Sequence, residues 1–217
     1  MDLEQARFNM IEQQIRPWDV LDETILNLLK SVKRETYVPA IYRNMAFMDI
    51  DIPLGHGETM LSPKVEARLL QELKLKPSDN VLEVGTGSGY MTALLASLAQ
   101  HVYSVDIVPE FVAAAELKLT AHGLSNVTLE VGDAARGWAR HAPYDAILLT
   151  GSEPILAPEL LAQLNRGGRL IAFVGVAPAM AARRIHVIEA GVHVSQDLFE
   201  TNVRALINAP QVPQFVF

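Results

Sequence analysis

The sequence predicts an α/β fold, built on a doubly wound and mostly parallel sheet, and three observations support it. From residue 80 onward, short apolar runs typical of buried strands alternate with helical segments. The loop after the first run carries three glycines at alternate positions, as in strand-to-helix turns that bind ligands. After Gly175 the pattern changes to a hairpin, so we expect antiparallel strands at the C-terminal end.

The composition limits the classes of protein to consider. The chain has 217 residues, 50% of them hydrophobic and 20% charged, which indicates one globular domain. The net charge is -7 and no basic cluster occurs, so nucleic-acid binding is disfavoured. The absence of cysteine excludes disulfides, thiolate metal sites and a cysteine nucleophile, and we predict no metal site.

The sequence also suggests where the protein resides. The first residues are acidic and lack the positively charged segment of a signal peptide, and no apolar run approaches the length of a membrane span. We therefore expect a cytoplasmic protein that does not bind membranes. The oligomeric state stays open.

The N-terminal part, residues 1–79, is expected to be helical with one long loop. Asp2 can cap a first helix, which Arg16-Pro17 should end. Asp22 opens a second helix. Residues 49–60 contain one proline and two glycines and are expected to be irregular, after which Ser62-Pro63 starts a third helix.

Residues 80–175 should form the core of the fold, and residues 176–217 an antiparallel extension. In the extension, 184–187 and 192–194 flank a hairpin turn at Glu189-Ala190-Gly191, and 198–199 with 206–207 suggest one more extended piece. The predicted strands of the core are 81–84, 102–105, 127–131, 146–149 and 169–174, and the predicted helices are 91–98, 110–122 and 158–164.

The glycine loop is the most informative segment. Its pattern, E-x-G-x-G-x-G from Glu83 to Gly89, differs from the G-x-G-x-x-G spacing of dinucleotide-binding enzymes. Glu83 stands where a carboxylate could reach a cationic group of a ligand. The loop resembles the first motif of class I S-adenosylmethionine-dependent methyltransferases, which implies that Gly85, Thr86, Gly87, Ser88 and Gly89 help to bind that cofactor. A glycine-rich turn without a ligand is the plainer alternative.

Two further carboxylates follow predicted strands. Asp106 ends the second strand, where a carboxylate can accept hydrogen bonds from both hydroxyls of a ribose. Asp133 follows the third strand, and either contacts an adenine amino group or only shapes a turn. The methyltransferase resemblance implies that the neighbours Ile107 and Ala134 also lie at the cofactor.

The resemblance extends to one family over almost the whole chain. The chain resembles the protein L-isoaspartate O-methyltransferase family, which implies a Rossmann-like class I methyltransferase fold, S-adenosyl-L-methionine as cofactor and a protein or peptide substrate with isoaspartyl residues. It also implies a substrate loop that includes His56, Thr59 and Leu61. The matching segments are 10–15, 34–39, 52–59, 81–90, 103–106, 126–127, 132–133 and 143–146.

One departure from the family is important. Leu61 occupies the place of the family's catalytic serine, and Ser62 comes one residue later. Ser62 is therefore the candidate catalytic residue, since a shift of the loop could bring its hydroxyl into place. The alternative, which we prefer, is that Ser62 is a helix N-cap with Pro63 at the first helical position.

The sequence is best interpreted as a methyltransferase that methylates a carboxylate of damaged, isoaspartyl protein. A carboxylate is already ionised at neutral pH, so this reaction needs no general base, and the chain shows no obvious catalytic His or Lys constellation. Leu61 leaves room for two alternatives: a methyltransferase of this fold with another acceptor, and a cofactor-binding protein without isoaspartyl activity. An NAD(P)-dependent oxidoreductase is disfavoured by the glycine spacing.

Overall fold

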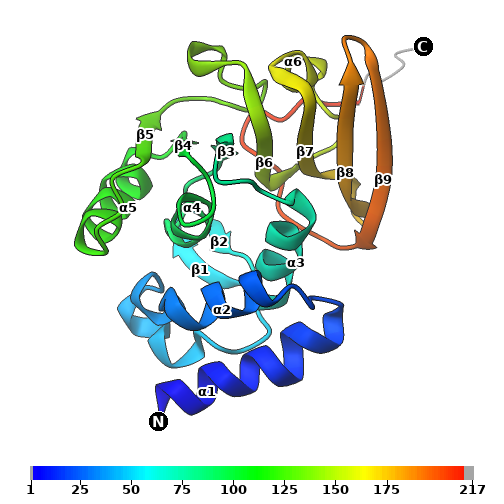
Figure 1. Cartoon of the computed structure of the whole chain (residues 1–217). Coiled ribbons are helices and arrows are strands. Elements are labelled where there is room, and N and C mark those ends of the chain that lie inside the picture. Colours follow the sequence, from blue (N-terminus) through cyan, green and yellow to red (C-terminus); the bar gives the residue numbers. More distant parts are fainter. Residues whose placement is uncertain (1, 213–217) are drawn as a thin grey trace.

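The computed structural model describes residues 2–212, and its centre is a seven-stranded sheet (Figure 1). The strand order is β5-β4-β3-β6-β7-β8-β9. Neighbours from β5 to β7 pair in parallel, and β8 and β9 continue the sheet antiparallel. This confirms the predicted fold class. The strands are β3 (Asn80–Val84), β4 (His101–Asp106), β5 (Val127–Val131), β6 (Tyr144–Glu153), β7 (Leu164–Val176), β8 (Ala179–Glu189) and β9 (Val192–Glu200).

The central strands are apolar throughout because both faces of the sheet are covered. In β3, Val81 packs into one buried cluster, whereas Leu82 and Val84 pack into a second cluster on the other face. Side chains of α3, α4 and α5 belong to the first cluster and Leu160 of α6 to the second. The helices are α3 (Pro63–Leu73), α4 (Tyr90–Ala96), α5 (Pro109–Ala121) and α6 (Pro158–Ala162), with a 3₁₀ turn, η5 (Ala139–His141), before β6.

The N-terminal region is helical as predicted and packs below the sheet in Figure 1. The carboxylate of Asp2 caps the first helix by accepting from two backbone N–H groups, and Asp22 caps the next. Helical winding continues through Pro17 to Trp18, one residue beyond the predicted end. The elements are α1 (Leu3–Met10), a π-helical turn η1 (Ile11–Ile15), η2 (Arg16–Trp18), α2 (Glu23–Ser31), η3 (Arg34–Thr36) and η4 (Ala40–Met45).

The expectation of irregular structure at 49–60 is wrong. This segment forms a two-stranded antiparallel hairpin of β1 (Ile52–Gly55) and β2 (Glu58–Met60). Gly55 and Gly57 have φ of 97° and 78°, so they allow the tight turn, and the buried Ile52 and Met60 anchor the hairpin to the core. The glycines that suggested irregular structure therefore mark the turn.

The C-terminal extension contains the predicted hairpin of β8 and β9, with its turn at 190–191. The further strand expected at 206–207 is absent from the described residues, where 203–207 make only an isolated bridge, Ser152 to Ala205, at the end of β6. This returning segment is the red ribbon of Figure 1. Residues 213–217 of the predicted extension lie outside the described residues. No helix in the described part of the chain is both long and apolar enough to cross a membrane.

Candidate active site

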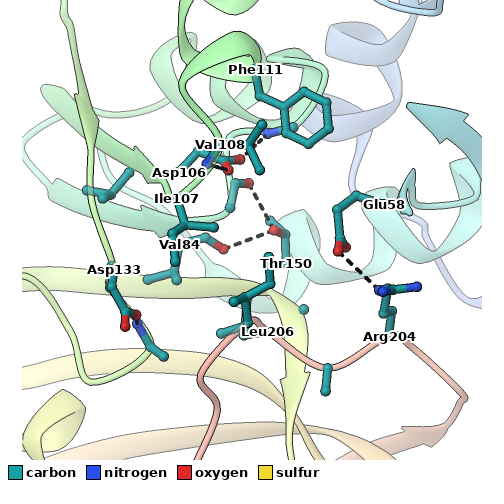
Figure 2. Close-up of a pocket in the computed structure, with 18 of the residues that line it drawn as sticks. Glu58, Val84, Asp106, Ile107, Val108, Phe111, Asp133, Thr150, Arg204 and Leu206 are labelled. Atoms are coloured by element: carbon teal, nitrogen blue, oxygen red, sulfur yellow. Dashed lines mark hydrogen bonds and ion pairs between the residues drawn. The ribbon is translucent and has the colours of Figure 1, made fainter. Parts of the chain in front are cut away.

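A pocket with an empty volume of about 730 Å³ opens at the carboxyl ends of the parallel strands. Loops after β3, β4 and β5 line one side, the β1–β2 hairpin and the returning segment 203–207 the other (Figure 2). Open α/β sheets bind ligands at this edge, where the strand order reverses. The predicted residues that line it are Thr59, Leu61, Gly85, Gly87, Asp106, Ile107, Asp133 and Ala134.

The glycine loop contacts β6 closely at Thr150. The Thr150 hydroxyl is 2.9 Å from the carbonyl oxygens of Val84 and of Gly85, to which it can donate (Figure 2). A Cβ atom on Gly85 would come within 2.2 Å of that hydroxyl, and the φ of Gly85 is +96°. Both facts require glycine at this position, so backbone rather than side chain faces the pocket.

Asp106 connects the glycine loop to the next loop. Its buried carboxylate accepts a hydrogen bond from the Gly87 N–H through one oxygen and from the Val108 N–H through the other, both at 2.9 Å. Each oxygen has a second lone pair, and Asp106 lines the pocket. The geometry therefore fits a carboxylate that also accepts from ligand hydroxyls.

Asp133 lines the pocket from the loop after β5, next to Asp106, and is exposed. One of its oxygens accepts from the Ala135 N–H at 3.1 Å, which is the turn-shaping role. The other accepts from Asn208 Nδ2 at 2.9 Å, so Asp133 also holds the residue that follows the returning segment. Both contacts leave lone pairs for a ligand.

The interpretation of Glu83 as a group that reaches a ligand is not supported, because Glu83 is fully buried below the loop and does not line the pocket. Its carboxylate accepts from the hydroxyls of Thr92 at 2.5 Å and Ser104 at 2.6 Å. Burial raises the pKa of Glu83 to about 8, although these two hydrogen bonds act in the opposite direction. Glu83 instead supports the loop from beneath.

Three other predicted loop residues are also outside the lining. The Thr86 hydroxyl is hydrogen-bonded to Ser104 at 2.7 Å, and the Ser88 hydroxyl accepts from the Tyr90 N–H at 3.2 Å. Gly89 caps α4, and a Cβ there would meet Ala115 at 2.9 Å. These residues hold the loop and pack it against α5.

The predicted substrate-loop residues and Ser62 do not all line the same pocket. Thr59 and Leu61 line the pocket, whereas Ser62 lines an adjoining groove that shares Leu61 with it. His56 is exposed at the hairpin turn, with its ring 5.4 Å from that of Phe111, and it is outside the pocket lining. The structure thus brings Leu61, and not Ser62, to the pocket.

Ser62 is the N-cap residue of α3, with Pro63 first in the helix, as predicted. However, its side chain makes no capping hydrogen bond, so the expected stabilisation by a capping hydroxyl is not supported. The Ser62 backbone N–H donates instead to the Asp51 carboxylate at 2.8 Å. Burial raises the pKa of Asp51.

Several residues at the site were not singled out in the sequence. Arg34, only 1% exposed, donates to the Leu61 carbonyl at 2.7 Å and pairs with Glu66, and so fixes the backbone beside the pocket. It lies in a segment that had only shown the family resemblance. Glu58 and Arg204, which both line the pocket, form an ion pair, with 3.0 Å between Glu58 Oε1 and Arg204 Nε (Figure 2). Residues 146 apart in sequence leave no local signal for such a pair.

The arrangement suits binding and positioning more than acid–base chemistry. Among the described residues that line the pocket, none is a lysine or histidine. Within residues 2–212, no group of three or more His, Cys, Asp or Glu side chains could hold a metal ion. The pocket combines apolar walls with a few convergent polar groups, which is typical of sites for small organic ligands.

Comparison with known proteins identifies close relatives. Residues 5–202 match the family described as Protein-L-isoaspartate(D-aspartate) O-methyltransferase (PCMT). Protein-L-isoaspartate O-methyltransferase from Opitutus terrae is 41% identical over 178 residues, which cover 80% of this chain and 76% of that protein. Protein-L-isoaspartate O-methyltransferase 1 from Anaeromyxobacter sp. is 40% identical over 202 residues, or 92% of this chain and 95% of that protein.

Solved structures agree on the fold. A protein-L-isoaspartate O-methyltransferase structure superposes with a TM-score of 0.80 at 22% identity and covers 95% of this chain and 66% of that one. A Plasmodium falciparum structure in complex with S-adenosyl-L-homocysteine, proposed there to be such an enzyme, has a TM-score of 0.76 at 19% identity and covers 95% and 99%.

Proposed function

The chain belongs to the protein-L-isoaspartate(D-aspartate) O-methyltransferase family, and we propose that it transfers a methyl group from S-adenosyl-L-methionine to the carboxylate of isoaspartyl residues in damaged proteins. The observation that carries the proposal is the family match across residues 5–202, together with a pocket that six of the ten predicted cofactor residues line. The family assignment excludes the NAD(P)-dependent oxidoreductase.

The residues present fit the proposed cofactor. The backbone at Gly85 and Gly87 is open to the pocket, and Asp106 has lone pairs for the ribose hydroxyls. Asp133 and the backbone beside it line the same pocket, and in this proposal they contact the adenine. In this proposal the direct contacts come from Gly85, Gly87, Asp106, Ile107, Asp133 and Ala134, and the loop is supported by Glu83, Thr86, Ser88 and Gly89.

The proposed reaction needs no general base from the protein. When bound, the cofactor supplies an electrophilic methyl group on a sulfonium. A carboxylic acid in water ordinarily ionises with a pKa of about 4, so the acceptor is already a nucleophile at neutral pH. The absence of lysine and histidine from the described lining fits such an acceptor. The residues of this chain contribute position and exclusion of water, through Leu54, Leu61 and Phe111 of the apolar wall.

We propose a division of the chain that follows from these roles. Residues 1–79 would supply the N-terminal helices and the substrate loop, residues 80–175 the cofactor-binding core, and residues 176–217 the C-terminal extension, of which 203–207 line the pocket. A cytoplasmic location stays a prediction. Isoaspartyl proteins are the proposed partners.

The test is methylation of a matched pair of peptides. The purified protein, with S-adenosyl-L-methionine, is given an isoaspartyl peptide and its ordinary aspartyl isomer, and mass spectrometry counts the added methyl groups. We expect a methyl ester on the isoaspartyl peptide only, and its loss in Asp106→Ala.

Leu61 favours a second candidate, because it presents an apolar side chain where the family has a hydroxyl. If the protein binds S-adenosyl-L-homocysteine but methylates neither peptide, the same site serves a methyltransferase with another acceptor. Failure to bind S-adenosyl-L-homocysteine would contradict both candidates.

A further inference from the structure

Arg204 lies on the returning segment, at a point where the backbone is fixed to β6. The Ser152 N–H donates to the Arg204 carbonyl at 2.8 Å, and the Leu206 N–H donates to the Ser152 carbonyl at 2.9 Å. The Ser152 hydroxyl donates to the Val203 carbonyl, also at 2.8 Å. The Arg204 side chain therefore starts from a defined position at the rim of the pocket.

The guanidinium of Arg204 reaches across the rim to the β1–β2 hairpin (Figure 2). A Cβ built on Gly57 would lie 3.2–3.4 Å from it, so the guanidinium lies close to the hairpin turn. Its Nε is 3.0 Å from Glu58 Oε1, but that oxygen is buried and has no hydrogen-bond partner among the described residues. Arg204 is 59% exposed, and its terminal nitrogens make no hydrogen bond within residues 2–212. The pair is thus a charge contact that leaves hydrogen-bonding capacity unused.

The charges around the pocket make this arginine important. Three of the described lining residues are carboxylates, namely Glu58, Asp106 and Asp133, whereas Arg204 is the only cationic one. An anion that enters this pocket is repelled by the carboxylates and loses water, which is costly without a partner. Guanidinium is well suited to that partnership, because its planar fork pairs with both oxygens of a carboxylate.

We propose that Arg204 binds the carboxylate of the methyl acceptor, and that Glu58 is its internal partner when no acceptor is present. The inference rests on the proposed function, since it needs an anionic acceptor. In the reaction, a bond forms between a carboxylate oxygen and the methyl carbon, and the carbon–sulfur bond breaks with its electron pair left on sulfur. The acceptor becomes a neutral ester, which pairs weakly with Arg204. Glu58 then regains its partner, which favours release of the product.

The experiment compares two ligands on the protein saturated with S-adenosyl-L-homocysteine, where no transfer occurs. Calorimetry measures binding of an isoaspartyl peptide and of the same peptide with that carboxylate replaced by a primary carboxamide. In Arg204→Gln we expect the acid to bind about tenfold to a hundredfold more weakly, as for loss of a charged hydrogen bond, with the amide within about twofold of native. In Glu58→Gln, which removes the internal competitor, we expect the acid to bind more tightly.

Two further variants separate charge from geometry and from general effects. Arg204→Lys keeps the charge but loses the fork, so the acid should bind with intermediate affinity. Arg140→Gln is the matched control, because Arg140 is 68% exposed, pairs with the largely buried Glu130 and lies outside the pocket. It should leave both affinities unchanged.

The outcomes of these experiments distinguish failure of the inference from failure of the proposed function. An equal loss for acid and amide in Arg204→Gln, or no loss at all, would overturn the inference while native methylation still supports the proposed function. If the native protein binds neither peptide and methylates neither, the proposed function fails, and this inference fails with it.

Discussion

At the scale of single residues, Asp106 holds two loops together and lines the pocket, where we propose that it also contacts the cofactor. Both of its oxygens already accept a backbone N–H, from Gly87 and Val108. We therefore expect its removal to cost both the proposed cofactor contacts and the alignment of the glycine loop. This makes Asp106 the sharpest residue on which to test the cofactor proposal.

We expect Asp106→Ala to bind S-adenosyl-L-homocysteine about tenfold to a hundredfold more weakly, the loss of charged hydrogen bonds worth about 1.5–3 kcal/mol. Asp106→Asn keeps one accepting oxygen and should fall between the two. Calorimetry measures the dissociation constants, and thermal unfolding shows that the variants stay folded. An unchanged dissociation constant in a folded Asp106→Ala would remove Asp106 from the binding site.

We expect substitutions of the neighbours Leu61 and Ser62 to have different effects on turnover and stability. Leu61 is 6% exposed and lines the pocket, so Leu61→Ser should raise kcat/KM on an isoaspartyl peptide by supplying a hydroxyl, while it lowers stability by about 2–4 kcal/mol. The Ser62 side chain makes no capping hydrogen bond, so Ser62→Ala should change stability by less than about 0.5 kcal/mol and leave turnover near native.

Steady-state kinetics and denaturant unfolding of the three proteins check this pair of predictions. A collapse of turnover in Ser62→Ala without loss of stability would show that the Ser62 hydroxyl serves the reaction. In that case the loop shifts by one residue during turnover.

At the scale of elements, the sequence predicted the strand, glycine loop and helix at 80–96 well. It predicted poorly the elements on the other side of the pocket, which are the β1–β2 hairpin and the returning segment 203–207. The strand, glycine loop and helix at 80–96 have local signals, because apolar runs and glycines report burial and backbone conformation at the same positions. The hairpin at 52–60 was mistaken for irregular structure, because its glycines were taken for loop residues and its anchors, Ile52 and Met60, are buried only by distant parts of the chain.

The contacts between the returning segment and β6, and the Glu58–Arg204 pair, connect residues far apart in sequence, so no local pattern reports them. The prediction that the Glu83 side chain reaches a ligand is not supported, for a different reason. Its place in the loop was correct, but which way its carboxylate points depends on Thr92 and Ser104, on the next helix and the next strand.

The close fit of the glycine loop to β6 gives a prediction for that element. Gly85→Ala places a Cβ against the Thr150 hydroxyl and strains φ at +96°, so it should destabilise the protein by about 2–4 kcal/mol and weaken S-adenosyl-L-homocysteine binding. Gly123→Ala is the matched control, because Gly123 has φ of +72° with open space around it. It should cost only about 1 kcal/mol and leave binding unchanged.

Denaturant unfolding and calorimetry compare the two alanine variants. Equal losses of stability with unaltered binding would mean that the contact between Gly85 and Thr150 has no special importance for the site.

At the scale of the whole molecule, buried charges connect the N-terminal region with the helices α3 and α4. Arg34 contacts the carbonyls of Ala46 and Leu61 as well as Glu66 of α3, and its guanidinium lies 5.2 Å from the ring of Tyr90 in α4. Arg7 pairs with Glu35 in the same region. Through Arg34, these contacts connect the backbone at Leu61, on one side of the pocket, with the start of α4, which follows the glycine loop on the other side.

The buried carboxyl group of Glu83, beneath the glycine loop, makes the free energy of unfolding depend on pH. Its pKa is raised from 4.5 to about 8 by burial, so between these values the folded protein holds a proton that the unfolded chain has lost. Because the folded state then binds more protons, the free energy of unfolding falls as the pH rises through this window, by up to about 1.4 kcal/mol per pH unit for this group. Above about pH 8 both states are ionised and the decline from Glu83 ends.

Glu83→Gln should remove this decline, since the amide resembles the protonated acid and does not titrate. We expect the stability of the variant relative to the native protein to increase steadily from about pH 5 to about pH 8. Glu153, whose pKa burial raises to about 7, contributes a decline of the same sign, but it is present in both proteins and cancels in the comparison. Urea unfolding of both proteins across that range measures the difference. Parallel stability curves would show that Glu83 titrates near its ordinary value, and that the carboxylate beneath the glycine loop is ionised at neutral pH.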